Sequence, residues 1–191
     1  MHRLTPAAAG AVLAAVLLTG CTSTAPADTR HTTPAPAPAS GSESLVRPAS
    51  AQSPFPVVHV SDGDTILVRR HSAVVSVRLI GVDTPETKRP NTPVQCFGPQ
   101  ASAFTTRTVS GRSVWLESDP VAGARDRYGR TLAYVWLEDG SLLDLELIEQ
   151  GFGRQYDYHD QPYTYRRQFQ AAEAGARAHR SGLWGTCPTD R

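Results

Sequence analysis

The stretch from Arg78 to Glu86, Arg-Leu-Ile-Gly-Val-Asp-Thr-Pro-Glu, places the strongest constraint on the fold. Apolar residues nearly alternate with polar ones before and within it, as they do in a half-buried β-strand. Pro85 ends that strand because it has no backbone N–H group and restricts the residue before it to an extended conformation. Arg78, Asp83 and Glu86 flank this stop, and such charges are costly to bury unless they are paired or bind an ion.

A second acidic turn, Ser-Asp-Gly-Asp-Thr at residues 61–65, precedes this strand. The two turns lie at opposite ends of a predicted hairpin system, so folding can bring Asp64, Asp83 and Glu86 together. Three hard oxygen donors with no Cys or His nearby suit Ca²⁺ or Mg²⁺ better than zinc. The sequence therefore predicts a site for one of these cations.

The first twenty residues are interpreted as a lipoprotein signal peptide (1–20). Their apolar run, Ala7 to Leu18, is too short to span a bilayer. The run ends in Leu-Thr-Gly-Cys, which resembles a bacterial lipobox and predicts that Cys21 carries the lipid. We then expect an exported protein, anchored to the extracytoplasmic side of the cell membrane by this lipid alone, or released from it. The alternative is an ordinary signal peptide that is cut after Ala25 or Ala27.

Residues 21–54 are rich in Ala, Pro, Ser and Thr and are predicted to be a disordered tether, since they cannot bury enough apolar surface to fold. Residues 55–188 are predicted to form one domain, long enough for a single core, and 189–191 a short tail. The chain has 19 basic and 18 acidic residues and a formal net charge of +1. This balance gives no global basic signal for nucleic acid, so any recognition of phosphate must be local.

The apolar patterns predict an α+β fold that is mainly β: a small five-stranded Greek-key barrel with about three helices packed outside. No regular strand–helix–strand alternation indicates a parallel sheet. The expected strands are Val57–Val60, Ile66–Arg70, Val74–Val82, Val114–Glu117 and Thr131–Leu137. The expected helices are Gly98–Val109, Leu142–Gln150 and Tyr163–Arg180.

Two cysteines remain after Cys21, and an even pair in an exported domain suggests a disulfide. Joining Cys96 to Cys187 would close a loop of about ninety residues and stabilise the domain by about 4 kcal/mol on a chain-entropy estimate. The alternative is a pair of free buried thiols.

An arginine-rich turn, Arg-Asp-Arg-Tyr-Gly-Arg, occupies residues 125–130. The planar guanidinium group matches phosphate oxygens two at a time, and the Tyr128 hydroxyl can add a donor to the same anion. The alternative for this turn is a solvated loop in which Asp126 pairs with its arginine neighbours.

Four segments, taken together, resemble the staphylococcal nuclease (thermonuclease) family. They are Asp62–Thr65, Arg78–Glu86, Phe97–Phe104 and Asp126–Tyr134. They occur in the family's order and at very similar spacing. The likeness runs from about residue 57 to residue 184 and implies a five-stranded oligonucleotide/oligosaccharide-binding (OB) barrel with three helices, in agreement with the strand pattern. With the signal-peptide pattern and Cys21, the chain resembles a bacterial secreted lipoprotein form of that family.

The resemblance implies a set of catalytic and metal-binding roles. Asp64 and Asp83 match carboxylate ligands of Ca²⁺, and the Thr84 carbonyl matches a third ligand. Glu86 matches the general base that acts on the attacking water. Arg78 and Arg130 match the pair that grips the scissile phosphate.

The same resemblance implies the residues that hold the substrate. Arg127 and Tyr128 match positions that bind the terminal phosphate of the nucleotide. Tyr156 and Tyr158 match aromatic positions over the base and along the groove. Asp62 matches an acidic position beside the metal ligands.

These roles imply a Ca²⁺-dependent endonuclease that hydrolyses DNA and RNA, prefers single strands and leaves 3′-phosphate ends. We expect it to be a monomer. One alternative is a catalytically silent barrel that binds nucleic acid. A second is a surface lipoprotein that binds calcium for stability alone. A phosphodiesterase acting on small nucleotides would use the same site residues.

Overall fold

The computed structural model describes residues 45–158 and 161–188. The predicted signal peptide, Cys21, most of the predicted tether and the predicted tail lie outside the described residues. Within the described part of the chain, no helix is both long and apolar enough to cross a bilayer.

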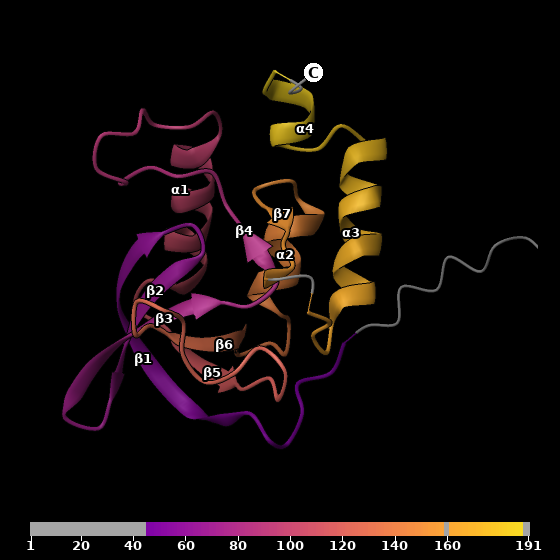
Figure 1. Ribbon diagram of the computed structural model, residues 1–191. Helices are drawn as coiled ribbons and strands as arrows, with labels where there is room; N and C mark the ends of the chain where they lie inside the picture. Colours follow the sequence, from indigo (N-terminus) through magenta and orange to yellow (C-terminus); the bar gives the residue numbers. More distant parts are fainter. Residues whose placement is uncertain (1–44, 159–160, 189–191) are drawn as a thin grey trace, which may run out of the picture. The chain divides into compact units, whose positions relative to one another are not determined.

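Five strands close into a barrel in the spatial order β1-β2-β3-β6-β5 (Figure 1). Their bounds are β1 Gln52–Asp62, β2 Thr65–Arg70, β3 Ala73–Leu79, β5 Ser113–Glu117 and β6 Thr131–Trp136. All neighbours are antiparallel except β3 and β6, which run parallel. The prediction of a five-stranded, mainly β barrel is confirmed.

The barrel is closed around side chains that point inward at every second strand position, as the pleat requires. Ile66 and Val68 of β2 face Val77 and Leu79 of β3, and all four are buried. The core continues through the buried Trp136 of β6 into the space beneath the helices.

One predicted strand, 74–82, is wrong as a single element. It breaks after Leu79, and β4 (Val82–Asp83) leaves the barrel to pair with β7 (Arg154–Gln155) in a separate two-stranded sheet. The break occurs at Gly81, whose φ of 74° is unfavourable for other residues. A Cβ atom there would also lie 2.6 Å from the ring of Tyr163, so the chain turns where only glycine fits.

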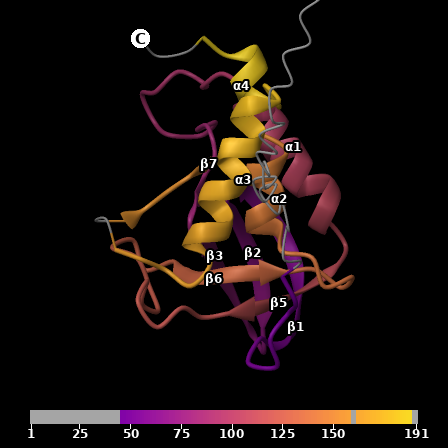
Figure 2. The same ribbon diagram turned by 90° about the vertical axis from the view of Figure 1, so that its right-hand side faces the viewer.

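The helices are α1 (Gly98–Val109), α2 (Leu143–Glu149), α3 (Arg166–Ala178) and α4 (Leu183–Thr186). In Figures 1 and 2 they gather at one end of the barrel, with α2 packed against α3. The bounds of α1 are as predicted. Helix α3 starts three residues later than predicted, and the four-residue α4 was not expected because its local pattern is too short to register.

The ordered domain starts before the predicted boundary at residue 55, because β1 begins at Gln52. Leu45 and Ala51 pack against the core. Arg47 donates a hydrogen bond to the Leu137 carbonyl at 2.8 Å, and its guanidinium lies 4.0 Å from the centre of the Trp115 ring. A few side chains thus attach this segment to the barrel although its composition resembles that of a tether.

A disulfide joins Cys96 to Cys187, with 5.8 Å between the two Cα atoms, so the predicted pairing is present. It connects the segment just before α1 to the end of α4. Beside it, the ring of Phe97 stacks on Phe152 at 5.5 Å between centroids.

Candidate active site

Asp64 lies in the turn between β1 and β2 and is nearly buried. Its Oδ2 accepts hydrogen bonds from the backbone N–H of Thr84 at 2.9 Å and from the Thr84 hydroxyl at 3.1 Å. Gly63 permits this approach, because a Cβ atom there would lie 2.7 Å from the Thr84 hydroxyl oxygen. The β1–β2 turn and the β4 segment are therefore joined through one carboxylate.

Arg78 is opposite Thr65 in the β2–β3 pairing, which brings it next to Asp64. Its Nη1 donates to the carbonyls of Leu79 and Val82, both at 2.7 Å. Its Nη2 lies 3.0 Å from Asp83 Oδ1 and 3.2 Å from Asp64 Oδ2. These contacts hold the guanidinium in one place, with its side chain only 12% exposed.

Asp83 lies at the end of β4, and its side chain is 57% exposed. Displacement of water by the surrounding cleft walls raises the pKa of this carboxyl, and the nearby Asp64 and Glu86 charges act in the same direction. Arg78 opposes the rise. A cation bound here would favour the ionised form in the same way as Arg78 does.

Glu86 and Asp62 form a neighbouring acidic pair. Partial burial acts to raise the pKa of Glu86, but hydrogen bonds from the Lys88 and Thr87 backbone N–H groups, at 2.9 and 3.0 Å, and from Asp62 lower it on balance. Burial and the contact with Glu86 raise the pKa of Asp62. The Thr87 hydroxyl donates to Asp62 at 3.0 Å. The contact between the two carboxyls thus shifts the pKa of Glu86 down and that of Asp62 up.

Arg130 immediately precedes β6, and the parallel pairing of β6 with β3 brings it to the same end of the barrel as Arg78. Its Nε donates to Asp126 at 2.6 Å. Its Nη1 contacts the Thr65 hydroxyl at 3.3 Å. Its side chain is 30% exposed, so it keeps more access to solvent than Arg78 does.

The predicted substrate-binding residues are exposed at the rim. Arg127 donates to the Tyr128 hydroxyl at 2.7 Å, and Tyr128 is 69% exposed. Tyr156 and Tyr158 are also exposed. Hydrogen bonding with Tyr128, and the nearby Tyr158 and Tyr156 side chains, raise the pKa of Arg127 further above its ordinary value, so it stays charged.

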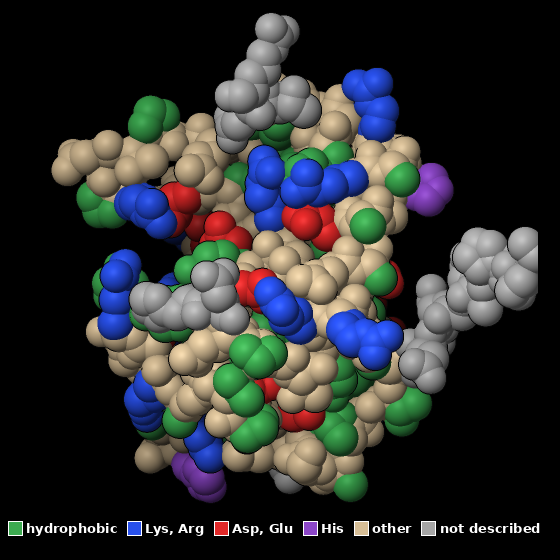
Figure 3. All heavy atoms as spheres, turned by 45° about the vertical axis from the view of Figure 1, so that its right-hand side comes forward, with side chains coloured by type: hydrophobic (Ala, Val, Ile, Leu, Met, Phe, Trp, Pro, Cys, Tyr) green, Lys and Arg blue, Asp and Glu red, His purple; other side chains and the backbone are tan. Residues whose placement is uncertain are grey.

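One cleft of about 610 Å³ brings together all the residues predicted to bind metal, substrate or the reacting phosphate. Figure 3 shows acidic and basic side chains side by side on this face of the molecule. The members of that set are Asp62, Asp64, Arg78, Asp83, Thr84, Glu86, Arg127, Tyr128, Arg130, Tyr156 and Tyr158. They come from four separate stretches of the chain, and the lipidation site Cys21 lies outside the described residues.

The donors in this cleft fit a hard cation. Among the described residues, no three His, Cys, Asp or Glu side chains form a metal-binding cluster. Asp64 and Asp83 nevertheless both direct an oxygen at one positively charged atom, Arg78 Nη2. Two carboxylates and a backbone carbonyl are oxygen donors of the kind that Ca²⁺ takes, with waters completing the coordination.

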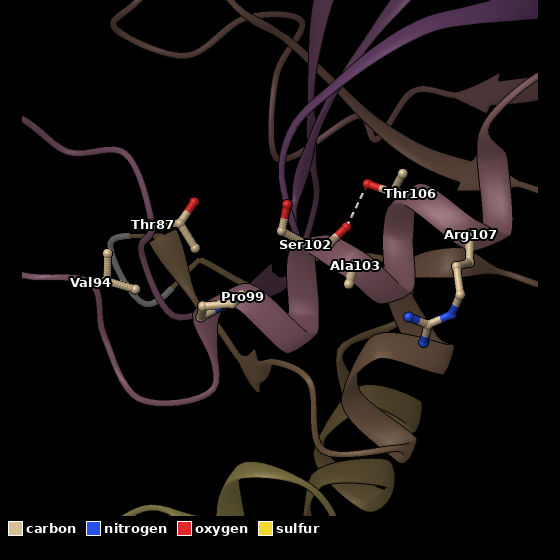
Figure 4. Close-up of a pocket in the computed structure, with 7 residues that line it drawn as sticks. All are labelled: Thr87, Val94, Pro99, Ser102, Ala103, Thr106 and Arg107. Atoms are coloured by element: carbon tan, nitrogen blue, oxygen red, sulfur yellow. Dashed lines mark hydrogen bonds between the residues drawn. The ribbon is translucent and has the colours of Figure 1, made fainter.

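A second depression, of about 480 Å³, lies between α1 and the loop before it (Figure 4). Its lining is Thr87, Val94, Pro99, Ser102, Ala103, Thr106 and Arg107. The Thr106 hydroxyl donates a hydrogen bond to the Ser102 carbonyl at 2.7 Å. The lining contains no carboxylate, histidine or cysteine, so it has no group for acid–base or nucleophilic chemistry.

Two residues of the site were not predicted from the sequence. Thr65 donates to Asp64 at 2.9 Å and accepts from Arg130, so it bridges the two sides of the cleft. Gln95 accepts from the Glu86 N–H at 2.8 Å, and its own N–H donates to the Glu86 carbonyl at 2.9 Å, which closes the base of the loop. Thr65 follows directly on the Asp-Gly-Asp turn, and this position was its only local signal.

Comparison with known proteins shows which family this chain resembles. A family model described as staphylococcal nuclease homologue matches residues 76–186. The thermonuclease of Staphylococcus hyicus is 42% identical over 130 residues, which are 68% of this chain and 75% of that protein. The thermonuclease of Staphylococcus intermedius is 42% identical over 128 residues, 67% of this chain and 74% of that protein.

A more distant relative is the SPbeta prophage-derived endonuclease YokF of Bacillus subtilis. It is 37% identical over 123 residues, which are 64% of this chain and 41% of the relative. The family model covers more than half of this chain, from within β3 to α4, and includes the predicted site residues from Arg78 to Tyr158, whereas Asp62 and Asp64 precede it. This chain therefore belongs to the staphylococcal nuclease family.

Proposed function

We propose that the protein is a Ca²⁺-dependent endonuclease that hydrolyses phosphodiester bonds in DNA and RNA, prefers single strands and leaves 3′-phosphate ends. The observation that carries this proposal is the convergence of Arg78 and Arg130 on a cleft that also contains Asp64, Asp83 and Glu86. The thermonucleases and the endonuclease to which the chain is similar support the same activity.

The two arginines would neutralise the reacting phosphate. A phosphodiester is anionic and repels hydroxide, and more negative charge develops on its oxygens in the transition state. Preorganised guanidinium groups stabilise that charge, and removing one such donor typically costs about 10²- to 10³-fold in rate. Arg78 suits this role because its protein partners already fix its orientation.

Glu86 would act on the attacking water. Its lowered pKa keeps the carboxylate ionised at neutral pH, so it can accept a proton. Its present hydrogen bonds to the Thr87 and Lys88 N–H groups occupy one oxygen, Oε1. The other oxygen, Oε2, lies 3.6 Å from Arg89 Nε at the exposed edge of the cleft.

Asp64, Asp83 and the Thr84 carbonyl would hold the Ca²⁺ ion. Bound there, the ion would supply positive charge beside the phosphate as a Lewis acid. The hydrogen bonds from Thr84 to Asp64 fix one ligand relative to another.

The exposed rim would hold the rest of the nucleotide. Arg127 and Tyr128 present a guanidinium and a hydroxyl to a terminal phosphate. Tyr156 and Tyr158 offer ring faces on which any base can stack, at about 1–3 kcal/mol per base. Stacking without reading base edges predicts weak sequence selectivity and a preference for single strands.

The proposed location is outside the cytoplasm. The signal-peptide pattern and the Leu-Thr-Gly-Cys motif favour export and lipid attachment at Cys21, with the membrane contacted through that lipid alone. The Cys96–Cys187 disulfide is the kind of bond that persists in oxidising compartments. Nothing in the proposed mechanism requires a second copy of the chain, and we propose a monomer.

The proposal is tested by incubating the purified protein with heat-denatured DNA in Ca²⁺ or in EGTA and analysing the fragment ends. We expect Ca²⁺-dependent cutting with 3′-phosphate ends, and we expect Glu86→Gln and Arg130→Ala to abolish most of it. Arg69→Ala is the control, since Arg69 is an exposed arginine of β2 outside the cleft.

Binding of DNA without cutting at any Ca²⁺ concentration would overturn the proposal in favour of a silent nucleic-acid-binding barrel. A rise in melting temperature with Ca²⁺, but no turnover, would instead indicate a calcium site that serves stability alone.

A further inference from the structure

Two arginines and a tryptophan form a cluster at the end of the molecule where α4 lies. The guanidinium of Arg154, on β7, lies 4.5 Å from the centre of the Trp184 ring. The guanidinium of Arg177, in the last turn of α3, lies 3.9 Å from the same ring centre. Two cations therefore share one indole, which neutralises neither charge.

The Arg154–Trp184–Arg177 cluster carries an excess of positive charge. Arg177 contacts Glu173 at 3.4 Å, while its side chain stays 55% exposed. Among the described residues, no carboxylate lies within ion-pair distance of Arg154, which is also exposed. Guanidinium groups held over an aromatic ring direct their N–H donors outward in the guanidinium plane, where they can bind phosphate.

The cluster adjoins the candidate active site. In the β4–β7 sheet, Arg154 is the direct cross-strand partner of Asp83, so the two side chains start from the same face of this ribbon. At Gly153 the two strands approach closely, because an added Cβ atom would lie 3.2 Å from the Asp83 carbonyl oxygen. Arg154 therefore lies directly beside Asp83, one of the residues that line the cleft.

The backbone that carries the Trp184 ring is held on both sides of that residue. Leu183, next to Trp184, donates a backbone hydrogen bond to the Gly151 carbonyl at 2.9 Å. The Cys96–Cys187 disulfide ties the end of α4 to the segment before α1. A preorganised pair of arginines loses less side-chain entropy on binding than two free ones do.

We propose that the Arg154–Trp184–Arg177 cluster is an accessory site that binds the backbone phosphates of single-stranded nucleic acid extending from the cleft past Asp83. This inference rests on the proposed function and adds a second contact region to it. Because both guanidiniums already cover the indole, the site takes phosphates rather than bases. Its contribution is independent of sequence, depends on salt and exists only for strands long enough to reach it.

The test compares strand lengths in a Glu86→Gln background with Ca²⁺, so that turnover does not consume the probe. Labelled thymidine oligonucleotides of about 3 and about 15 nucleotides are titrated by fluorescence anisotropy at several salt concentrations. The test variant is Arg154→Gln with Arg177→Gln. The control, Arg69→Gln with Arg167→Gln, removes the same charge from exposed arginines elsewhere on the domain.

We expect the test variant to weaken binding of the long oligonucleotide and to lower its salt slope by about 1.4, at about 0.7 per phosphate contact. The short oligonucleotide should bind as before, and the control should change neither. Thermal melting checks the fold of each variant. Arg154→Gln alone, which leaves the α3 contact intact, should lower the slope by about half as much.

Other outcomes overturn the inference. Equal losses in the test and control pairs would show that only net charge matters. If the long oligonucleotide bound the test variant as tightly as the parent, the cluster would not be a nucleic-acid-binding site, but the proposed function would still hold. Failure of the parent to bind either length would overturn both. If the test variant bound the long oligonucleotide normally but lost binding to phosphatidylglycerol vesicles, the cluster would be a membrane contact instead.

Discussion

The two sides of the cleft are built differently. The strand-borne side consists of Asp64, Arg78, Asp83 and Thr84, and its central guanidinium is 12% exposed and bonded to two carbonyls and two carboxylates. The loop-borne side, which carries Tyr128, Arg130, Tyr156 and Tyr158, is held in part by contacts within a few residues, such as the Arg130–Asp126 pair. Arg78 is thus built into the fold, whereas Arg130 on the other side is more exposed to solvent.

This difference indicates a division of labour. The strand-borne side can hold an ion and a phosphate with little rearrangement, which is what transition-state stabilisation requires. The loop-borne side presents exposed groups, Tyr128, Tyr156 and Tyr158, that can adapt to varied nucleotides. Catalytic geometry and substrate tolerance are therefore assigned to different parts of the chain.

Asp119 supports the loop-borne side from below. Its Oδ1 accepts from the N–H groups of Val121 and Ala122, which lead into the arginine-rich turn. Its Oδ2 accepts from the Tyr134 hydroxyl and from both the N–H and the hydroxyl of Thr164. Five hydrogen bonds on one buried carboxylate join this loop to β6 and to the segment before α3.

The largest effect is expected for Arg78→Ala. It would leave Asp64 and Asp83 without their shared cation and two carbonyls without a donor, so the free energy of unfolding should fall by about 3–5 kcal/mol. Urea denaturation measures this loss, with Arg69→Ala as the exposed-arginine control. A loss below about 1 kcal/mol would mean that Arg78 is no more committed to the fold than a surface arginine is.

Arg130→Ala should reduce the cleavage rate strongly and the stability little. Its ion pair with Asp126 is partly exposed, so the free energy of unfolding should change by less than about 1 kcal/mol. The rate of DNA cleavage should fall by about 10²- to 10³-fold if Arg130 grips the reacting phosphate. Initial rates and urea denaturation on the same preparation separate the two effects. A large stability loss without a rate loss would reverse the contrast drawn between the two sides.

Asp119→Asn should lower stability by about 2 kcal/mol at pH 7. Burial acts to raise the pKa of Asp119, but hydrogen bonds from Thr164, Ala122 and Tyr134 outweigh it and lower the pKa to about 2. A lowered folded-state pKa means that the stabilisation is complete above the ordinary value of 3.8 and disappears as the pH falls toward about 2.

The wild-type and Asp119→Asn stabilities should therefore converge between about pH 4 and pH 2, which denaturation at a series of pH values measures. Glu138→Gln, a change at an exposed carboxylate, serves as the control. A difference that stays constant across this range would show that the ionised form of Asp119 is not what stabilises the loop.

The smallest effect is expected for Tyr156→Ala. A partly exposed ring that stacks on one base should contribute about 1 kcal/mol to binding, so KM should rise about fivefold with kcat unchanged. Steady-state kinetics on single-stranded DNA provide the measurement, and Tyr156→Phe, which keeps the ring, should behave as wild type. A fall in kcat for Tyr156→Ala would place Tyr156 with the strand-borne machinery.

Much of this architecture was predictable because its signals are local. Alternating apolar residues predict β2, β5 and β6, and Pro99 near the start with Gly111 after the end predicts α1. The disulfide followed from cysteine number and the expected compartment. The acidic turns could be placed at the ends of strands for the same local reasons.

Where prediction failed, the cause was contact between distant segments. The strand predicted for 74–82 breaks because Gly81 turns against Tyr163, which lies far along the sequence. Residues 45–54 have the composition of a tether, yet Arg47 finds Trp115 and the Leu137 carbonyl. Neither partner can be read from the segment itself.

The sequence alone determined which chemical groups are present and roughly where most strands, helices and turns lie, since these depend on side-chain type and on spacing within a few residues. Barrel closure determined how those groups meet. The parallel pairing of β3 with β6 brings Arg130 to Arg78, and the β4–β7 ribbon brings Arg154 to Asp83. Such pairings depend on the shape and burial of the whole core, and no short stretch of sequence encodes them.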